Sequence, residues 1–316
     1  MGEHAEYIAR HVDADLCFRR RLDVDNGIQV DFTKGKPEDK EDKPMETQVL
    51  AERHKVQVQD IRGQEPSYTL DKNGFVYRLH EMPELARVSD EEYVKETIIP
   101  ETESLVRKIT GATRTVTFAH RVRCLAEDGA LLASNRAPAH SVHSDFTIRG
   151  ALHNLETVFP DTQERKRLLA GRVLIINVWR PLKPIQRDPL TVCDWSSVNI
   201  QAESIPTCVT LPNGWNEIGR YAFSPSHRWC YLSAQQPNEP LIFTQFDSSK
   251  VDEGGFTVPH SAFVDPEYSD FAARESLEIK MFAFVLVCVC SVCSVCLRGQ
   301  RSIKETWKFQ SSRLYL

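Results

Sequence analysis

The chain has 316 residues, of which 41% are hydrophobic, so it is long and apolar enough to bury a large core. Its net charge of −5 and its isoelectric point near 6.1 give no electrostatic reason to expect nucleic acid or an anionic membrane as a partner. The N-terminus lacks the apolar segment of a secretion signal. Five cysteines are dispersed without metal-ligand spacing, as is typical of reduced thiols: Cys17, Cys124, Cys193, Cys208 and Cys230. We therefore expect a cytoplasmic protein with a small-molecule partner.

The first part of the chain, residues 1–111, mixes strand and helix signals. Residues 34–43 are nearly all charged and predict a solvated loop. The alternating residues 56–63, followed by an Asn73-Gly74 turn that leads into residues 75–79, predict a β-hairpin. From 90 to 111 the apolar spacing predicts a helix that Pro100 interrupts and Gly111 ends. We expect an N-terminal α/β arm that belongs to the same domain as the rest.

Residues 112–287 consist mainly of short β-type runs separated by Pro, Gly and Asn clusters. One helix is expected over residues 161–170. The β-type runs cover residues 113–123, 140–148, 172–182, 228–234, 241–249 and 276–287. Their spacing predicts a mainly β fold, with an antiparallel barrel or a double-sheet jelly roll over residues 112–287.

The residues with the clearest chemistry are His143 and Asp145, two apart in a strand-like run, so that both side chains share one face. Two imidazoles and one carboxylate cover one face of an iron(II) octahedron and leave three positions open. His260 is the second histidine of this set, on a strand expected to lie opposite the first pair. His140 could replace His143, but it has the opposite strand parity to Asp145. The sequence thus predicts a metal site of His143, Asp145 and His260.

An anion site is predicted a short distance beyond His260. In Arg274-Glu275-Ser276 the first and third side chains share one strand face. A guanidinium can bind a carboxylate through two charge-assisted hydrogen bonds, and the Ser276 hydroxyl can add a third. The ordered set His-x-Asp, distant His and Arg-x-Ser is more specific than any of its parts.

Several long segments carry a family resemblance, among them VQDIRGQEPSYTLDKNGFVY, HSVHSDFTIRGA and PHSAFVDPEYSDFAARESLEIK. They resemble the fungal and bacterial gibberellin-desaturase-like and aspergillic-acid-type hydroxylase/desaturase proteins of the 2-oxoglutarate/iron(II) dioxygenase superfamily. The resemblance extends over roughly residues 55–284. It implies a double-stranded β-helix (jelly-roll) core, hydroxylation or desaturation of a secondary metabolite, and the use of Fe(II), 2-oxoglutarate and dioxygen. It also implies metal ligation by His143, Asp145 and His260, and co-substrate binding by Arg274 and Ser276.

Three weaker candidates for co-substrate binding are Asn177, Arg180 and Tyr231. Asn177 and Arg180 are polar residues in an apolar strand and therefore need partners. Arg180 either contacts a carboxylate of the co-substrate or substrate, or forms a structural ion pair. Tyr231 either donates to 2-oxoglutarate from a neighbouring strand, or is a buried core tyrosine.

The C-terminal segment, residues 288–316, is atypical and rich in cysteine. Its four cysteines could bind zinc or an iron–sulfur cluster, and the uncharged stretch from Met281 to Leu297 could anchor the chain in a membrane. The anchor is disfavoured because the first of these residues are needed for the last strand. A third interpretation is that the segment replaces the usual C-terminus. In that case the protein could be a catalytically impaired relative that acts as a binding or accessory protein. A cupin-type protein would share the barrel but would not need Arg274.

Overall fold

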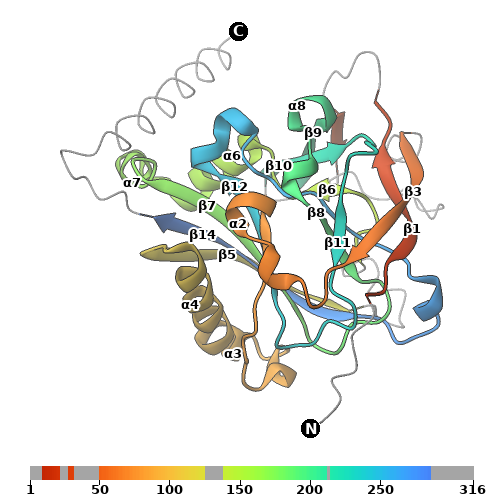
Figure 1. Cartoon of the computed structure of the whole chain (residues 1–316). Coiled ribbons are helices and arrows are strands. Elements are labelled where there is room, and N and C mark those ends of the chain that lie inside the picture. The colour runs from red at the N-terminus through yellow and green to blue at the C-terminus, as the bar shows by residue number, and fades with distance from the viewer. Residues whose placement is uncertain (1–8, 22–27, 32–49, 125–137, 212–213, 286–316) are drawn as a thin grey trace, which may run out of the picture.

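Two β-sheets form the frame of the protein in the computed structural model, which describes residues 9–21, 28–31, 50–124, 138–211 and 214–285 (Figure 1). Within these ranges the larger sheet has nine strands, in the order β1 (Val12–Arg19), β3 (Ala51–Asp60), β11 (Trp229–Tyr231), β8 (Leu190–Cys193), β13 (His260–Ala262), β6 (His143–Ser144), β10 (Gly214–Tyr221), β9 (Ser204–Leu211) and β2 (Ile28–Asp31). The smaller sheet has five, in the order β4 (Phe75–Tyr77), β12 (Leu241–Asp247), β7 (Arg172–Pro181), β14 (Glu275–Val285) and β5 (Arg114–Cys124). This is the expected mainly β jelly roll.

Apolar side chains hold the two sheets together. Phe75 and Phe243 of the smaller sheet share one buried cluster with Val192 and Cys230 of the larger sheet. The outer face of the smaller sheet is covered by α4 (Ile99–Thr110), which lies alongside β5 and β14 in Figure 1. A second cluster joins α6 (Ile148–Val158) and α7 (Thr162–Leu168) to the inner face of β7 and β14.

The remaining helical elements are short. They are α2 (Leu70–Asn73), α3 (Glu91–Tyr93) and α8 (Ile200–Glu203), the π-helical turn η3 (Val94–Ile98), and the 3-10 turns η1 (Glu65–Ser67), η2 (Leu85–Arg87), η4 (Trp195–Ser197), η5 (Ser248–Glu253) and η6 (Pro266–Tyr268).

Strand β14 shows how the alternation of a strand divides its side chains between the two faces of the smaller sheet. Ile279 and Met281 belong to the cluster under α4, whereas Phe282 belongs to the cluster on the inner face. β14 pairs with β7 without interruption from Ser276 to Val285. The even-numbered residues of β14 therefore face the space between the sheets.

Much of the predicted secondary structure is confirmed. Strands occupy five of the expected β-type runs, as β5, β7, β11, β12 and β14, and α7 lies within the helix expected over 161–170. The helical segment predicted over 90–111 is α3, η3 and α4, with Pro100 in the first turn of α4. Gly111 ends α4 with a left-handed φ of 72°.

The predicted hairpin at Asn73-Gly74 is wrong. Asn73 ends the short helix α2, and Gly74 follows it as a C-cap with φ of 82°. The Thr69 side chain caps the start of this helix by accepting a hydrogen bond from the Lys72 amide. Because α2 separates them, β3 joins the larger sheet and β4 joins the smaller one.

The strand expected over residues 140–148 is also much shorter than predicted. β6 contains only His143 and Ser144, and α6 begins at Ile148. The Thr147 hydroxyl accepts a hydrogen bond from the Gly150 amide and so starts this helix. Thr147 followed by an amphipathic stretch is a helix signal that the strand interpretation overlooked.

Two predicted segments lie outside the described residues: the charged loop 34–43 and the Cys-rich tail 288–316. Within the described parts of the chain, no helix is both long and apolar enough to cross a membrane. Met281 and the residues up to Val285 belong to β14.

The close packing around Gly74 gives a stability prediction. A Cβ at this position would overlap the Val258 side chain, and the left-handed φ adds backbone strain. We expect Gly74→Ala to lower the free energy of unfolding by about 2–5 kcal/mol, measured by denaturant titration. Gly63→Ala is the matched control, because Gly63 has φ of 83° but no atom within 4 Å of the place that a Cβ would take. It should cost only about 1–2 kcal/mol. Equal losses in both variants would contradict the tight contact with Val258.

Candidate metal centre

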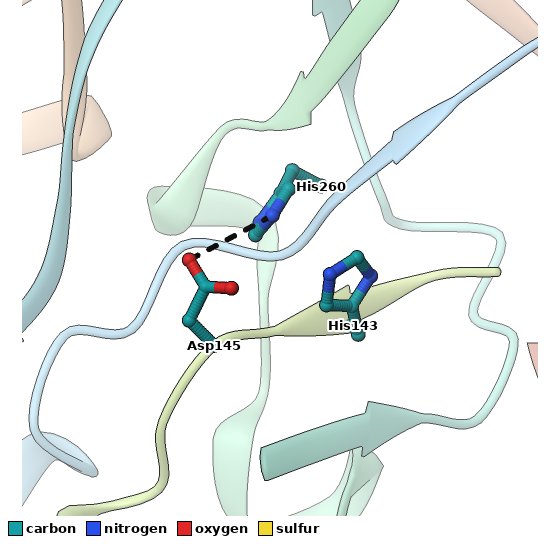
Figure 2. Close-up of side chains that lie close together, drawn as sticks. All are labelled: His143, Asp145 and His260. Atoms are coloured by element: carbon teal, nitrogen blue, oxygen red, sulfur yellow. Dashed lines mark ion pairs between the residues drawn. The ribbon is translucent and has the colours of Figure 1, made fainter. Parts of the chain in front are cut away.

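His143, Asp145 and His260 come together between the two sheets (Figure 2). His143 lies on β6, Asp145 at the bend that follows it, and His260 on β13. β6 and β13 are antiparallel neighbours in the larger sheet, with His143 directly paired with His260. The second histidine therefore lies beside the first, and the expectation that its strand lies opposite is wrong. One potential ligand atom from each residue lies within 4.8 Å of the others.

Both histidines present a free ring nitrogen to this space. Nδ1 of His143 lies 2.7 Å from the carbonyl oxygen of Ser141, and Nδ1 of His260 lies 3.2 Å from that of Val258. Since a carbonyl only accepts, each Nδ1 carries the proton and each Nε2 keeps its lone pair. Burial, and then the neighbouring His260, lower the pKa of His143 to about 3, and burial lowers the pKa of His260. Both rings are thus neutral at pH 7, the form that binds metals.

Each polar group of Asp145, in the backbone and in the side chain, has a hydrogen-bond or ion-pair partner. Its amide donates to Gln245 Oε1 at 2.8 Å, and its carbonyl accepts from Asn216 Nδ2 at 3.0 Å. In the carboxylate, Oδ2 accepts from Asn177 Nδ2 at 3.2 Å and Oδ1 lies 2.8 Å from Lys280 Nζ. Burial favours the protonated acid, yet Lys280 holds the pKa of Asp145 below its ordinary value. The carboxylate is therefore ionised and fixed in place.

Two charged residues behind Asp145 were not predicted from the sequence. Lys280 Nζ lies 3.0 Å from Glu278 Oε1, and Arg123 Nε donates to Glu278 Oε2 at 3.1 Å. Despite burial, Lys280 keeps the pKa of Glu278 well below its usual value, and Asp145 raises the pKa of Lys280. The signal that could have found both residues is strand alternation, since positions 278 and 280 share the face of Arg274 and Ser276.

A small cavity of about 20 Å³ adjoins the two histidines. The polar part of its lining includes His143, His260, Asn177 and Arg274, and the apolar part includes Trp179 and Phe243. Histidines of the larger sheet thus face Arg274, which directly precedes β14 of the smaller sheet, across one space.

Arg274 and Ser276 offer unused hydrogen-bond donors at this site. Arg274 is only 5% exposed, lies over the Trp179 ring and donates from Nη1 to the carbonyl oxygen of Asp188 at 2.5 Å. Within the described residues, its Nε and the fully buried Ser276 Oγ have no hydrogen-bond partner. Burial lowers the pKa of Arg274 to about 10, so the guanidinium is still charged at pH 7. A buried cation with an unpaired donor is costly unless an anion binds there, and a carboxylate fits both donors.

Of the two candidates on β7, the structure places only Asn177 at the cavity. Arg180 is three residues further along, so it points to the opposite face of the sheet. Its Nη1 donates to the carbonyl oxygens of His80 at 3.0 Å and Pro237 at 2.8 Å. Neither expected role of Arg180, carboxylate binding or a structural ion pair, matches these contacts, which tie two loops to the sheet.

Tyr231 and His140 also lie away from the cavity lining. The Tyr231 hydroxyl donates to the carbonyl oxygen of Arg10 at 2.6 Å, and its ring packs edge-on against Phe263. This matches the alternative of a core tyrosine. His140 pairs with Asp188 at 3.4 Å, so it does not take the place of His143.

The three potential metal ligands give a prediction for metal addition. Mn(II) at about 100 times its dissociation constant should stabilise the protein by about 2.7 kcal/mol, visible as a rise in thermal midpoint. His143→Ala should abolish this rise because it removes a ligand. Arg180→Met, which lies on the other face of β7, should keep it. The same rise in His143→Ala would mean that the metal binds elsewhere.

Comparison with known proteins assigns the chain to a family. A family model described as "Oxidoreductase/YMDC permease-like domain" matches residues 23–284. The chain is 34% identical to the hydroxylase/desaturase efuI of Hormonema carpetanum, over 72% of this chain and 83% of the relative. It is 31% identical to the alpha-ketoglutarate-dependent dioxygenase phiK of a fungal species, over 71% of this chain and 82% of the relative.

Among solved structures, a variant of the iron and alpha-ketoglutarate-dependent endoperoxidase NvfI superimposes with a TM-score of 0.74 at 25% sequence identity. The match covers 87% of this chain and 97% of that one. The chain therefore belongs to the family of fungal hydroxylase/desaturases and Fe(II)/2-oxoglutarate-dependent dioxygenases.

Proposed function

We propose that the protein is a non-haem Fe(II)- and 2-oxoglutarate-dependent oxygenase that hydroxylates or desaturates a small-molecule natural product of secondary metabolism. The observation that carries this proposal is one cavity with metal-ligand atoms on one side and buried, unpaired donors for a carboxylate on the other. Relatives named as hydroxylase/desaturases and alpha-ketoglutarate-dependent dioxygenases support it.

In this proposal His143, Asp145 and His260 hold the iron. Such a set of two histidines and one carboxylate leaves three positions open, enough for 2-oxoglutarate and dioxygen together. When bound, iron with 2-oxoglutarate would activate dioxygen so that hydrogen can be removed from an unreactive carbon.

The other residues bind the co-substrate and shape the cavity. Arg274 and Ser276 bind a carboxylate of 2-oxoglutarate with the donors that lack protein partners. Asn177 orients Asp145 through its side-chain amide. Trp179 and Phe243 provide apolar walls that exclude water around the reacting groups.

The proposal includes the setting in which this chemistry takes place. Residues 1–111 and 112–287 are taken as one domain, because β1 and β3 extend the larger sheet and β4 the smaller one. A cytoplasmic location is supported by Cys17, Cys193, Cys208 and Cys230, which are free thiols in the structure. The partner is a small molecule, in line with a cavity beside the metal ligands and a net negative charge.

The first test is anaerobic addition of Fe(II) and 2-oxoglutarate. We expect a visible charge-transfer band that disappears in His143→Ala, and succinate release once oxygen and a substrate are admitted. No band in well-folded protein would favour a binding or accessory role. A band without any succinate release would argue against the oxygenase.

The second test compares two buried arginines. Arg274→Met should weaken 2-oxoglutarate binding by about 2–5 kcal/mol, or at least about thirtyfold in Kd, because it removes the charge opposite a buried carboxylate. The affinity can be measured by calorimetry in the presence of Mn(II). Arg180→Met is the matched control, because Arg180 is equally buried but bonds only to the His80 and Pro237 loops. It should lower stability and leave the affinity unchanged. A similar loss of affinity in both variants would argue against Arg274 as the anchor.

A further inference from the structure

The inner face of β14 continues beyond the proposed co-substrate anchor. After Arg274 and Ser276, the next two residues on this face are Glu278 and Lys280. Arg274 and Ser276 have donors without partners, whereas Glu278 and Lys280 are bonded on several sides. The proposed function gives this second pair no role.

Lys280 stands directly behind the metal-ligand carboxylate. Its Nζ lies 2.8 Å from Oδ1 of Asp145 and 3.0 Å from Oε1 of Glu278. Glu278 is fixed in turn by Arg123 Nε at 3.1 Å and by Asn177 Nδ2 at 2.8 Å. The Lys280 ammonium is therefore held in one place by a chain of charges that ends on β5.

Packing alone does not account for a lysine at this position, where the side chain is only 18% exposed. An apolar side chain of similar volume is often as stable as a buried ion pair, because burying charges costs free energy of solvation. This cost points to a role for Lys280 in the site.

The contact with Lys280 divides the two oxygens of Asp145. Oδ1 is bound to the ammonium. Oδ2, which also accepts from Asn177 Nδ2 at 3.2 Å, lies 4.0 Å from Nε2 of His260, on the side of the other ligands. A carboxylate that bound the metal through both oxygens would occupy a second coordination position. Only two positions would then remain, fewer than 2-oxoglutarate and dioxygen need together.

We propose that Lys280, held by Glu278 and Arg123, is a positioning residue that restricts Asp145 to binding the metal through Oδ2 alone, which keeps open the positions for 2-oxoglutarate. This inference rests on the proposed function. It assigns Glu278 and Lys280 to the metal site. Arg274 and Ser276, earlier on the same face, are assigned to the co-substrate.

The experiment measures two affinities in Lys280→Met. Mn(II) binding is followed by calorimetry, and 2-oxoglutarate binding is then measured at saturating Mn(II). We expect Mn(II) affinity to be retained, because Asp145 and both histidines remain. We expect 2-oxoglutarate affinity to fall by about tenfold or more, the scale on which losing a partner of a metal ligand changes the affinity or activity of a metal site. Lys280→Arg, which keeps a cation beside Oδ1, should recover most of the affinity.

Two further variants separate positioning from other effects. The double variant Lys280→Met/Glu278→Gln removes one charge of each sign, so its 2-oxoglutarate affinity should stay low if positioning matters. Arg172→Met removes a different ion pair with a buried partner, Asp247, whose carboxylate lies 2.6 Å from Arg172 Nη2. It should lower the thermal midpoint without changing either affinity.

Three outcomes would overturn the role of Lys280. They are unchanged 2-oxoglutarate affinity in Lys280→Met, loss of Mn(II) and 2-oxoglutarate binding in parallel, and recovery of 2-oxoglutarate affinity in the neutral double variant. If the unsubstituted protein itself does not bind 2-oxoglutarate with Mn(II), the proposed function fails and this inference fails with it.

Discussion

The site depends above all on how Asp145 is held between the two sheets. Asn216, which binds its carbonyl oxygen, belongs to β10 of the larger sheet. Gln245, Asn177 and Lys280, which bind its amide and carboxylate, belong to β12, β7 and β14 of the smaller sheet. The carboxylate thus takes its position from the packing of one sheet on the other. A change that shifts the sheets would move this ligand even if every site residue were kept.

Strand geometry lets the same elements serve both stability and chemistry. On β14 the odd-numbered Ile279 and Met281 pack under α4, while the even-numbered residues face the space between the sheets. A second device acts on β12, whose pairing with β7 shifts between Thr244 and Phe246. The shift leaves Gln245 as the extra residue of a bulge. Its side-chain oxygen accepts a hydrogen bond from the Asp145 amide. Regular alternation and one local break together complete the site.

Residue type and short-range spacing were sufficient for the centre of the proposed site. His143 and Asp145, and likewise Arg274 and Ser276, are separated by two positions, and this local relation survives in the structure even though β6 is very short. The same alternation puts Asn177 and Arg180, three apart, on opposite faces of β7, although the sequence interpretation took both as candidates for co-substrate binding. Local capping was harder to detect. Thr69 caps a helix where a hairpin turn was expected, and Thr147 caps a helix where a strand was expected.

Contacts between distant segments could not be obtained from the sequence. The amino-acid sequence alone supports a mainly β fold, a set of metal-ligand residue types and a carboxylate anchor, because these follow from patterns within a few residues. Only the tertiary structure decided that His260 lies beside His143, that Tyr231 belongs to the core, and that Lys280 pairs with Asp145. The physical reason is that strand order and register determine which side chains meet, and both depend on the packing of the whole chain.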